Sequence, residues 1–343
     1  MTSPDLYGDP GKVSNCSLMC QECQGREESS WEAVMTALVT KEAGVMAVLC
    51  GAGLVTNTLA VSLMVASITH LHHTSWYLIN RAIADMLFLL TVPVDAGTHL
   101  QDSWLYGSVM CQMRSTVAIM APLLSSVFLV AISSSWYLDA CKPNLDAKYR
   151  SILLKVVSAV CWFGCIVFTI PTFLQSEVFM EVSRVRFHCV SLPLSEDTIL
   201  GQVLRLEIIF LVFAIPFVIS WVFVSLVHQV HKNQTNVLPQ PSTSEAAPSQ
   251  PGPKLPYRLL ITLLVAFTGC QGPYWLVYLV RELLRHVEFS AGAMMMFPVT
   301  MCLPALNAAI NPLLCIYFLR DLRKDKPKVN KTHQPEMIAL FTL

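Results

Sequence analysis

Seven apolar stretches, separated by short polar segments, occupy most of the chain. They lie at 43–69, 75–99, 108–140, 152–174, 201–230, 257–285 and 291–318. A helix needs about 20 apolar residues to cross a bilayer core of about 30 Å, and each stretch reaches that length. The sequence therefore predicts an all-α membrane protein with a bundle of seven transmembrane helices.

The composition agrees with a membrane protein and argues against other classes. Hydrophobic residues make up 54% of the 343 residues and charged residues only 13%, against roughly 25% charged residues in soluble domains. The formal net charge is zero, so we expect no nucleic-acid partner. The sequence contains no metalloprotease, serine-hydrolase or P-loop motif, so we expect no enzyme. A transporter is the remaining alternative, but the two halves show no internal repeat.

Basic residues predict which side of the membrane each segment faces. With the amino end outside, 13 Lys and Arg residues face the cytosol and seven face outward, in agreement with the positive-inside rule. No secretory signal peptide is visible, so the first span would be its own anchor. We predict a plasma-membrane protein with an extracellular segment at 1–42, a seven-transmembrane domain at 43–319 and a cytoplasmic tail at 320–343. The proline-rich loop at 233–256 should be mobile, and the basic segment 320–328 should form a short amphipathic helix against inner-leaflet lipids.

The amino-terminal segment contains a candidate glycosylation site and a group of cysteines. Asn15, Cys16 and Ser17 form an N-glycosylation sequon, which predicts a glycan on Asn15. Cys20 and Cys23 follow closely, and an odd number of three cysteines leaves their pairing open.

A series of polar, aromatic and proline residues marks the seven spans. The series comprises Asn57, Asn80 to Asp85, Thr91 to Pro93, Trp104 to Cys111, Trp162, Pro171, Pro216, Cys270 to Tyr274 and Asn307 to Pro312. In order and spacing the series resembles the rhodopsin-like, class A, G-protein-coupled receptors over nearly the whole chain. The Thr91-Val92-Pro93 pattern is nearest to peptide, chemoattractant and chemokine receptors. The resemblance implies an extracellular ligand and a G protein or arrestin as cytosolic partner.

Two cysteines are placed to close the outer loop over the bundle. Cys111 stands at the outer end of the third span, and Cys189 stands in the loop before the fifth span. A disulfide between them would contribute about 3 to 4 kcal/mol in the chain-entropy model. The alternative is two unpaired cysteines that pack as small apolar residues.

An acidic residue in the second span is the most unusual polar position. A carboxylate near mid-membrane is costly unless it faces the bundle interior with partners. The resemblance implies a sodium ion held by Asp85, Ser125, Asn307 and Asn311, and oxygen ligands suit such a cation. The alternative is a protonated Asp85 that is hydrogen-bonded within the bundle. Arg81, another ionisable residue of this span, stands where the family has leucine.

The outer halves of the spans contain candidate ligand-binding residues. Arg114 and Arg205 could each bind an anionic ligand group, or could extend to the membrane interface instead. Gln271 and Tyr274 of the sixth span complete the candidate pocket. Ala118 stands where amine receptors have an aspartate, so we expect a peptide, or an anionic lipid or nucleotide, rather than an amine.

The positions that transmit activation in the family are altered. They are Ser135, Trp136, Tyr137, Val224, Gln271 and Cys315. Trp136 replaces the arginine that would reach the G protein, and an indole has no charge and one donor. We favour a receptor with weak, atypical or scavenger-type signalling. The alternative is a constitutively active receptor of the kind that some viruses encode, because the same changes remove the inactive lock.

Overall fold

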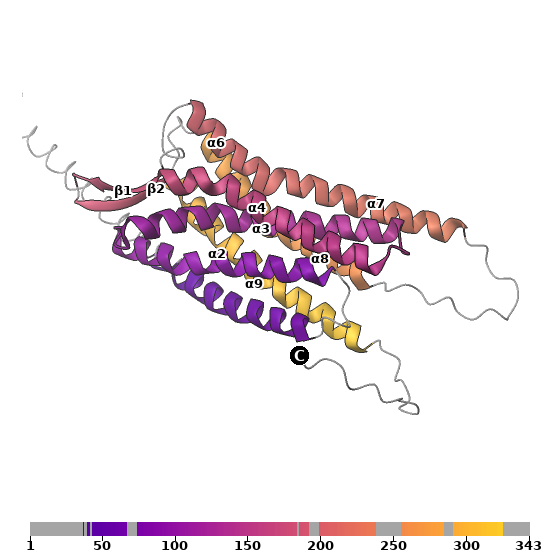
Figure 1. Ribbon diagram of the computed structural model, residues 1–343. Helices are drawn as coiled ribbons and strands as arrows, with labels where there is room; N and C mark the ends of the chain where they lie inside the picture. Colours follow the sequence, from indigo (N-terminus) through magenta and orange to yellow (C-terminus); the bar gives the residue numbers. More distant parts are fainter. Residues whose placement is uncertain are drawn as a thin grey trace, which may run out of the picture.

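The computed structural model describes residues 37, 40–41, 43–66, 74–183, 185–191, 199–237, 255–284 and 291–324. Elongated helices lie side by side in one bundle (Figure 1). Their bounds are Ala43–Ala66 for the first helix, then α2 Ser75–Gln101, α3 Gly107–Cys141, α4 Ala147–Gln175, α6 Ile199–Ile209, the π-helix η1 Phe210–Ala214, α7 Ile215–Val237, α8 Leu255–Leu283 and α9 Ala291–Lys324. The fifth span consists of α6, η1 and α7 in succession.

The helices confirm the predicted seven-span architecture. Six helices among the described residues are long and apolar enough to cross a membrane, and α9 contributes the shorter apolar segment Cys302–Phe318. Helix α9 continues unbroken to Lys324, so the first part of the predicted amphipathic segment extends the last span. The rest of that segment lies outside the described residues, as do Asn15, the three amino-terminal cysteines and most of the proline-rich loop.

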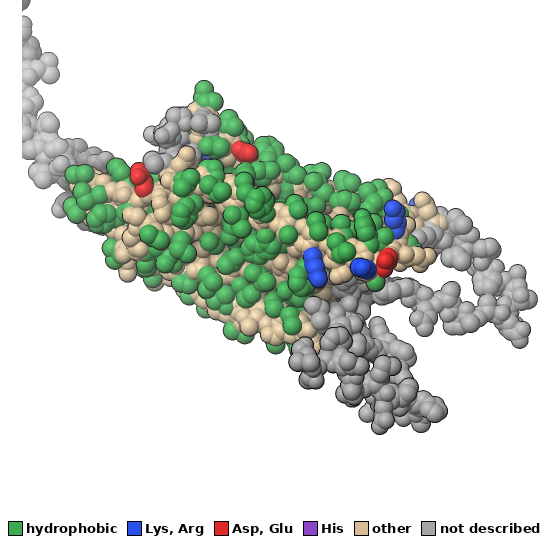
Figure 2. All heavy atoms as spheres, in the orientation of Figure 1, with side chains coloured by type: hydrophobic (Ala, Val, Ile, Leu, Met, Phe, Trp, Pro, Cys, Tyr) green, Lys and Arg blue, Asp and Glu red, His purple; other side chains and the backbone are tan. Residues whose placement is uncertain are grey.

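Helix α3 lies at the centre of the bundle. It packs against α2, α4 and α7, and its outer end contacts both strands of the outer loop. Leu124, Phe128 and Leu129 of α3 are fully buried, as are Leu260 and Leu264 of α8. On the face shown in Figure 2, hydrophobic side chains cover most of the bundle and the few charged side chains lie mainly toward its ends. This surface suits lipid, in which exposed apolar side chains have no cost.

Close packing holds the first helix against the bundle at a glycine. A Cβ atom added to Gly53 would lie 2.6 Å from Leu89 Cδ1 of α2 and 3.4 Å from the Cβ of Ala309 of α9. Small residues permit such close approaches between membrane helices. Asn57, one turn later, donates from Nδ2 to the Gly53 and Ala308 carbonyls at 2.8 and 2.9 Å. The first span is therefore joined to α9 by both packing and hydrogen bonding.

Two local details differ from the sequence-based expectation. Helix α4 begins at Ala147, five residues before the predicted start, because the Asp146 carboxylate caps it by accepting from the Lys148 backbone N–H at 3.0 Å. In the fifth span, the wider π-helical turn η1 lies directly before Pro216, which the sequence analysis did not predict. Proline has no N–H to donate to the preceding turn, and a π-turn accommodates that loss.

The outer loop between α4 and α6 folds as a hairpin, which the sequence analysis did not predict. Strands β1 Ser176–Glu181 and β2 Arg186–Ser191 pair antiparallel at one end of the bundle (Figure 1). The predicted disulfide joins Cys189 of β2 to Cys111 of α3, with a Cα–Cα distance of 5.5 Å. The backbone N–H of Trp104 donates to the Phe187 carbonyl at 2.7 Å. The hairpin is therefore held across the outer end of α3 by a covalent bond and by backbone pairing.

Removal of this disulfide should destabilise the protein. We expect the Cys111→Ala/Cys189→Ala variant to lose about 4 kcal/mol of unfolding free energy, because the bond closes a loop with a sequence separation of 78 residues. Thermal unfolding of the purified protein in detergent would measure the loss. Cys161→Ala, which removes a free cysteine, is the matched control; an equal effect of the two changes would contradict the prediction.

Candidate ligand site and signalling face

Both arginines of the candidate pocket are paired with carboxylates of neighbouring helices. Arg114 of α3 donates from Nε to Asp95 Oδ1 of α2 at 2.6 Å, and this pair is partly exposed. Arg205 of α6 donates from Nε to Glu282 Oε1 of α8 at 2.6 Å. The second pair is nearly buried, with side-chain exposures of 5% and 10%. The outer pocket thus offers both charge signs, and an anionic ligand group would have to compete with two internal carboxylates.

The pocket residues of α8 belong to an aromatic cluster. Gln271 is buried and its Oε1 accepts from Trp275 Nε1 at 3.1 Å. Tyr274 lies edge-on to Trp275, with ring centroids 4.9 Å apart, and also contacts Tyr278. Sequence reasoning missed Trp275 and Tyr278. Their spacing of one helical turn from Gln271 and Tyr274 was the available signal, because residues four apart share a helix face.

A second group of polar residues lies in the middle of the bundle. Asn311 of α9 donates from Nδ2 to Asp85 Oδ2 at 3.1 Å. Ser125 of α3 accepts from Arg81 Nε at 3.2 Å, and Asn307 lies buried one turn before Asn311. The structure therefore brings Asp85, Ser125 and Asn311 together, since both Ser125 and Asn311 contact the Asp85 carboxylate. The buried Arg81 guanidinium adds a positive charge that the sodium-site prediction did not include, and the sodium site stays a prediction.

Apolar and aromatic contacts surround the altered positions at the end of α3 that is predicted to face the cytosol. Trp136 is half-buried against the apolar core, and the Tyr137 ring lies 5.7 Å from that of Phe223 on α7. Ser135 Oγ lies 3.4 Å from Thr74 Oγ1 at the start of α2. Two further altered positions, Val224 and Cys315, are buried. None of these five positions has a charged side chain.

An ion pair that the sequence analysis did not identify joins α3 to α4 at this end. Arg150 Nη1 contacts Asp139 Oδ1, and both side chains are largely buried. The residues are 11 positions apart and flank a tight turn, so their proximity could have been inferred from the turn. The pair therefore joins the last turn of α3 to the first turn of α4.

Comparison with known proteins assigns the chain to a family. A family model described as 7 transmembrane receptor (rhodopsin family) matches residues 56–316. The chain belongs to this family. Similar proteins include bombesin receptor subtype-3 of Ovis aries, 25% identical over 80% of this chain and 70% of the relative, and lysophosphatidic acid receptor 6 of Gallus gallus, 24% identical over 82% and 91%. C-C chemokine receptor type 9 of Homo sapiens is 26% identical over 75% and 68%.

Membership of the rhodopsin family confirms the resemblance inferred from the motifs. The protein is a multi-pass membrane receptor and not an enzyme, as its relatives are receptors. The effect of the altered positions on signalling stays a prediction.

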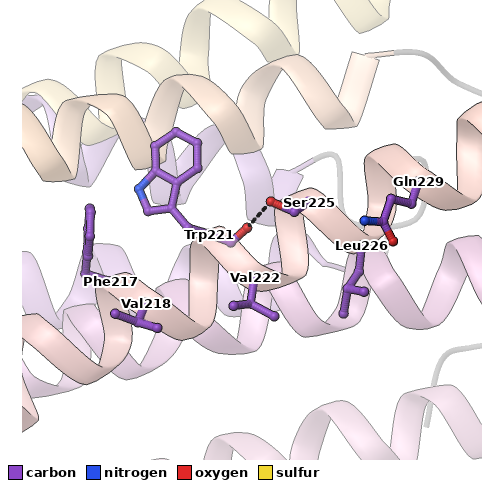
Figure 3. A pocket seen from close by; sticks show the side chains of 7 residues that line it. All are labelled: Phe217, Val218, Trp221, Val222, Ser225, Leu226 and Gln229. Carbon is purple, nitrogen blue, oxygen red and sulfur yellow. Dashed lines mark hydrogen bonds between the residues drawn. The ribbon is translucent and has the colours of Figure 1, made fainter.

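A surface groove on this rhodopsin-family receptor lies away from the candidate ligand pocket. Figure 3 shows a groove lined only by α7 residues, from Phe217 and Val218 to Gln229. Ser225 Oγ donates to the Trp221 carbonyl at 2.9 Å and is thereby satisfied within the helix. Val218 and Val222 are more than half exposed. The groove therefore belongs to the apolar outer surface of the receptor.

The buried pair between Arg205 and Glu282 should stabilise the outer half of the bundle. We expect Glu282→Gln to cost about 3 to 5 kcal/mol of unfolding free energy, because it leaves a buried guanidinium without its counter-charge. Thermal unfolding would measure the cost. Glu207→Gln, at an exposed carboxylate on α6, the helix that contains Arg205, is the control and should change little. A Glu282→Gln variant as stable as Glu207→Gln would show that the pair does not join α6 to α8.

Proposed function

We propose that this receptor binds a peptide at its extracellular face and couples weakly or atypically to G proteins, as a scavenger or modulator does. The orientation follows the distribution of basic residues, with the amino end outside and the carboxyl end in the cytosol. The proposal rests on the position of Trp136 at the inner end of α3. This side chain packs against the apolar core, at a position where the family has a charged arginine.

Other contacts at the inner face support low output. The Tyr137–Phe223 contact joins α3 to α7, and the Asp139–Arg150 pair joins α3 to α4. If α3 moves away from α4 and α7 to admit a cytosolic partner, both of these contacts have to break. The replacement of the arginine also removes the main charged contact for a G protein, whereas arrestin recruitment would depend on other cytosolic residues.

The charges of the outer pocket favour a peptide over a simple anion. Arg114 and Arg205 are each paired with a carboxylate, so these four groups together give the pocket no net charge. A peptide offers both charge signs and can exchange partners with both pairs. An anionic lipid or a nucleotide is the second class, and the relatives' names include a bombesin receptor and a receptor for lysophosphatidic acid.

A revertant experiment tests the signalling part of the proposal. We expect Trp136→Arg to raise ligand-free G-protein dissociation several-fold above the wild-type level at equal surface expression. The new arginine would lack its usual acidic partner, because Ser135 precedes it, and would be free to reach the G protein. Trp136→Gln, which opens the same space without a charge, should stay at the wild-type level.

The opposite result would identify a constitutively active receptor. Strong ligand-free signalling by the wild type, abolished by deletion of residues 142–150, would contradict weak coupling. Arrestin recruitment measured in the same cells would show whether the receptor uses that partner instead.

A further inference from the structure

Arg81 is the largest fully buried side chain in the described part of the receptor. It lies on α2, one turn before Asp85, and its exposure is 2%. Residues four apart lie on one helix face, so the guanidinium and the carboxylate face the same region between the helices. A buried arginine in a membrane protein is costly and requires compensation by an opposite charge or by hydrogen bonds.

The direct contacts of Arg81 satisfy only part of the guanidinium. Nε donates to Ser125 Oγ at 3.2 Å, whereas Nη1 and Nη2 are buried without a hydrogen-bond partner. Acceptors are left over in the same way, since Oδ1 of Asn57, of Asn307 and of Asn311 is buried and unpartnered. Donors of Arg81 that lack an acceptor therefore lie in the same part of the bundle as asparagine oxygens that lack a donor.

A small cavity connects several of these groups. Arg81, Asp85, Asn57, Asn311 and Cys315 are among the residues that line it. The space left for the centre of a water-sized sphere is about 10 Å³, which is close to what a single water requires. One water there could accept from the guanidinium and donate to an asparagine oxygen or to the Asp85 carboxylate.

We propose that the Arg81 guanidinium is the resident cation of this polar centre and replaces the sodium ion that the family pattern implies. One carboxylate and one guanidinium make the centre neutral, with a bridging water between them. A sodium ion would add an uncompensated positive charge beside Arg81 in a medium of low dielectric constant, where like charges repel strongly. The cation is attached to α2 by its own side chain, so it cannot dissociate as an ion can. The inference does not depend on the proposed ligand.

Sodium dependence of thermal stability tests this assignment without any signalling assay. The purified receptor is unfolded in sodium or in N-methylglucamine chloride at a constant ionic strength of about 0.15 M. We expect no sodium-specific shift of the wild-type unfolding temperature. Arg81→Leu should unfold several degrees earlier without sodium, because Asp85 loses its counter-charge, and should regain stability in a saturable manner as sodium is added.

A double variant and a matched arginine provide the controls. Arg81→Leu/Asp85→Asn should lose the sodium response, because no charge remains for the ion to neutralise. Arg150→Leu removes an arginine that is paired with Asp139, away from the polar centre. This variant should show no sodium response, whatever its unfolding temperature. A saturable sodium shift in the wild type would overturn the proposal, and so would a folded Arg81→Leu variant that ignores sodium.

A charge-balance comparison covers the case in which Arg81→Leu does not fold. Asp85→Asn leaves the buried guanidinium uncompensated, so it should unfold earlier than the double variant Arg81→Leu/Asp85→Asn, which contains neither charge. A double variant that unfolds earlier than Asp85→Asn would show that Arg81 does not depend on Asp85, and would overturn the proposal.

Discussion

The absence of water from the bilayer core constrains the backbone of this receptor. Each peptide N–H and C=O that crosses the core must find its hydrogen-bond partner inside its own helix. All described spans are accordingly helical, and the π-turn at Phe210–Ala214 keeps the ladder connected beside Pro216. The hairpin formed by β1 and β2 lies at the end of the bundle, where backbone groups meet water or the other outer loop.

Lipid is as apolar as the faces of the helices, so polar contacts contribute strongly to how the helices associate. Asn57 reaches the Ala308 carbonyl, Trp162 Nε1 donates to Asn80 Oδ1 at 3.0 Å, and Arg81 reaches Ser125. These bonds join the first helix to α9, α4 to α2 and α2 to α3. The polar residues that resembled family landmarks thus serve as links between helices, whatever their part in signalling.

The two ends of the bundle differ in the kind of contact that holds them. The outer end is held by the Cys111–Cys189 disulfide and the Arg205–Glu282 pair, and it contains polar groups of both charges. The inner end is held by aromatic packing around Tyr137 and by one ion pair at the α3–α4 corner. The first end therefore contains charged groups of both signs, whereas the altered positions at the other end are surrounded mainly by apolar and aromatic side chains.

The sequence by itself determined the helical class, the approximate spans, the disulfide and the family, because apolar length and the order of landmark residues are properties of the chain alone. Only the tertiary structure decided the partners of the charged residues. The sequence leaves open whether Arg114 and Arg205 bind a ligand or extend to the interface, but their carboxylate partners come from α2 and α8, 19 and 77 residues away. Likewise, Arg81 donates to Ser125 of α3, and Asn311 of α9 donates to the neighbouring Asp85. Helix periodicity shows which face a charge occupies, but the neighbour on that face is chosen by how the helices pack.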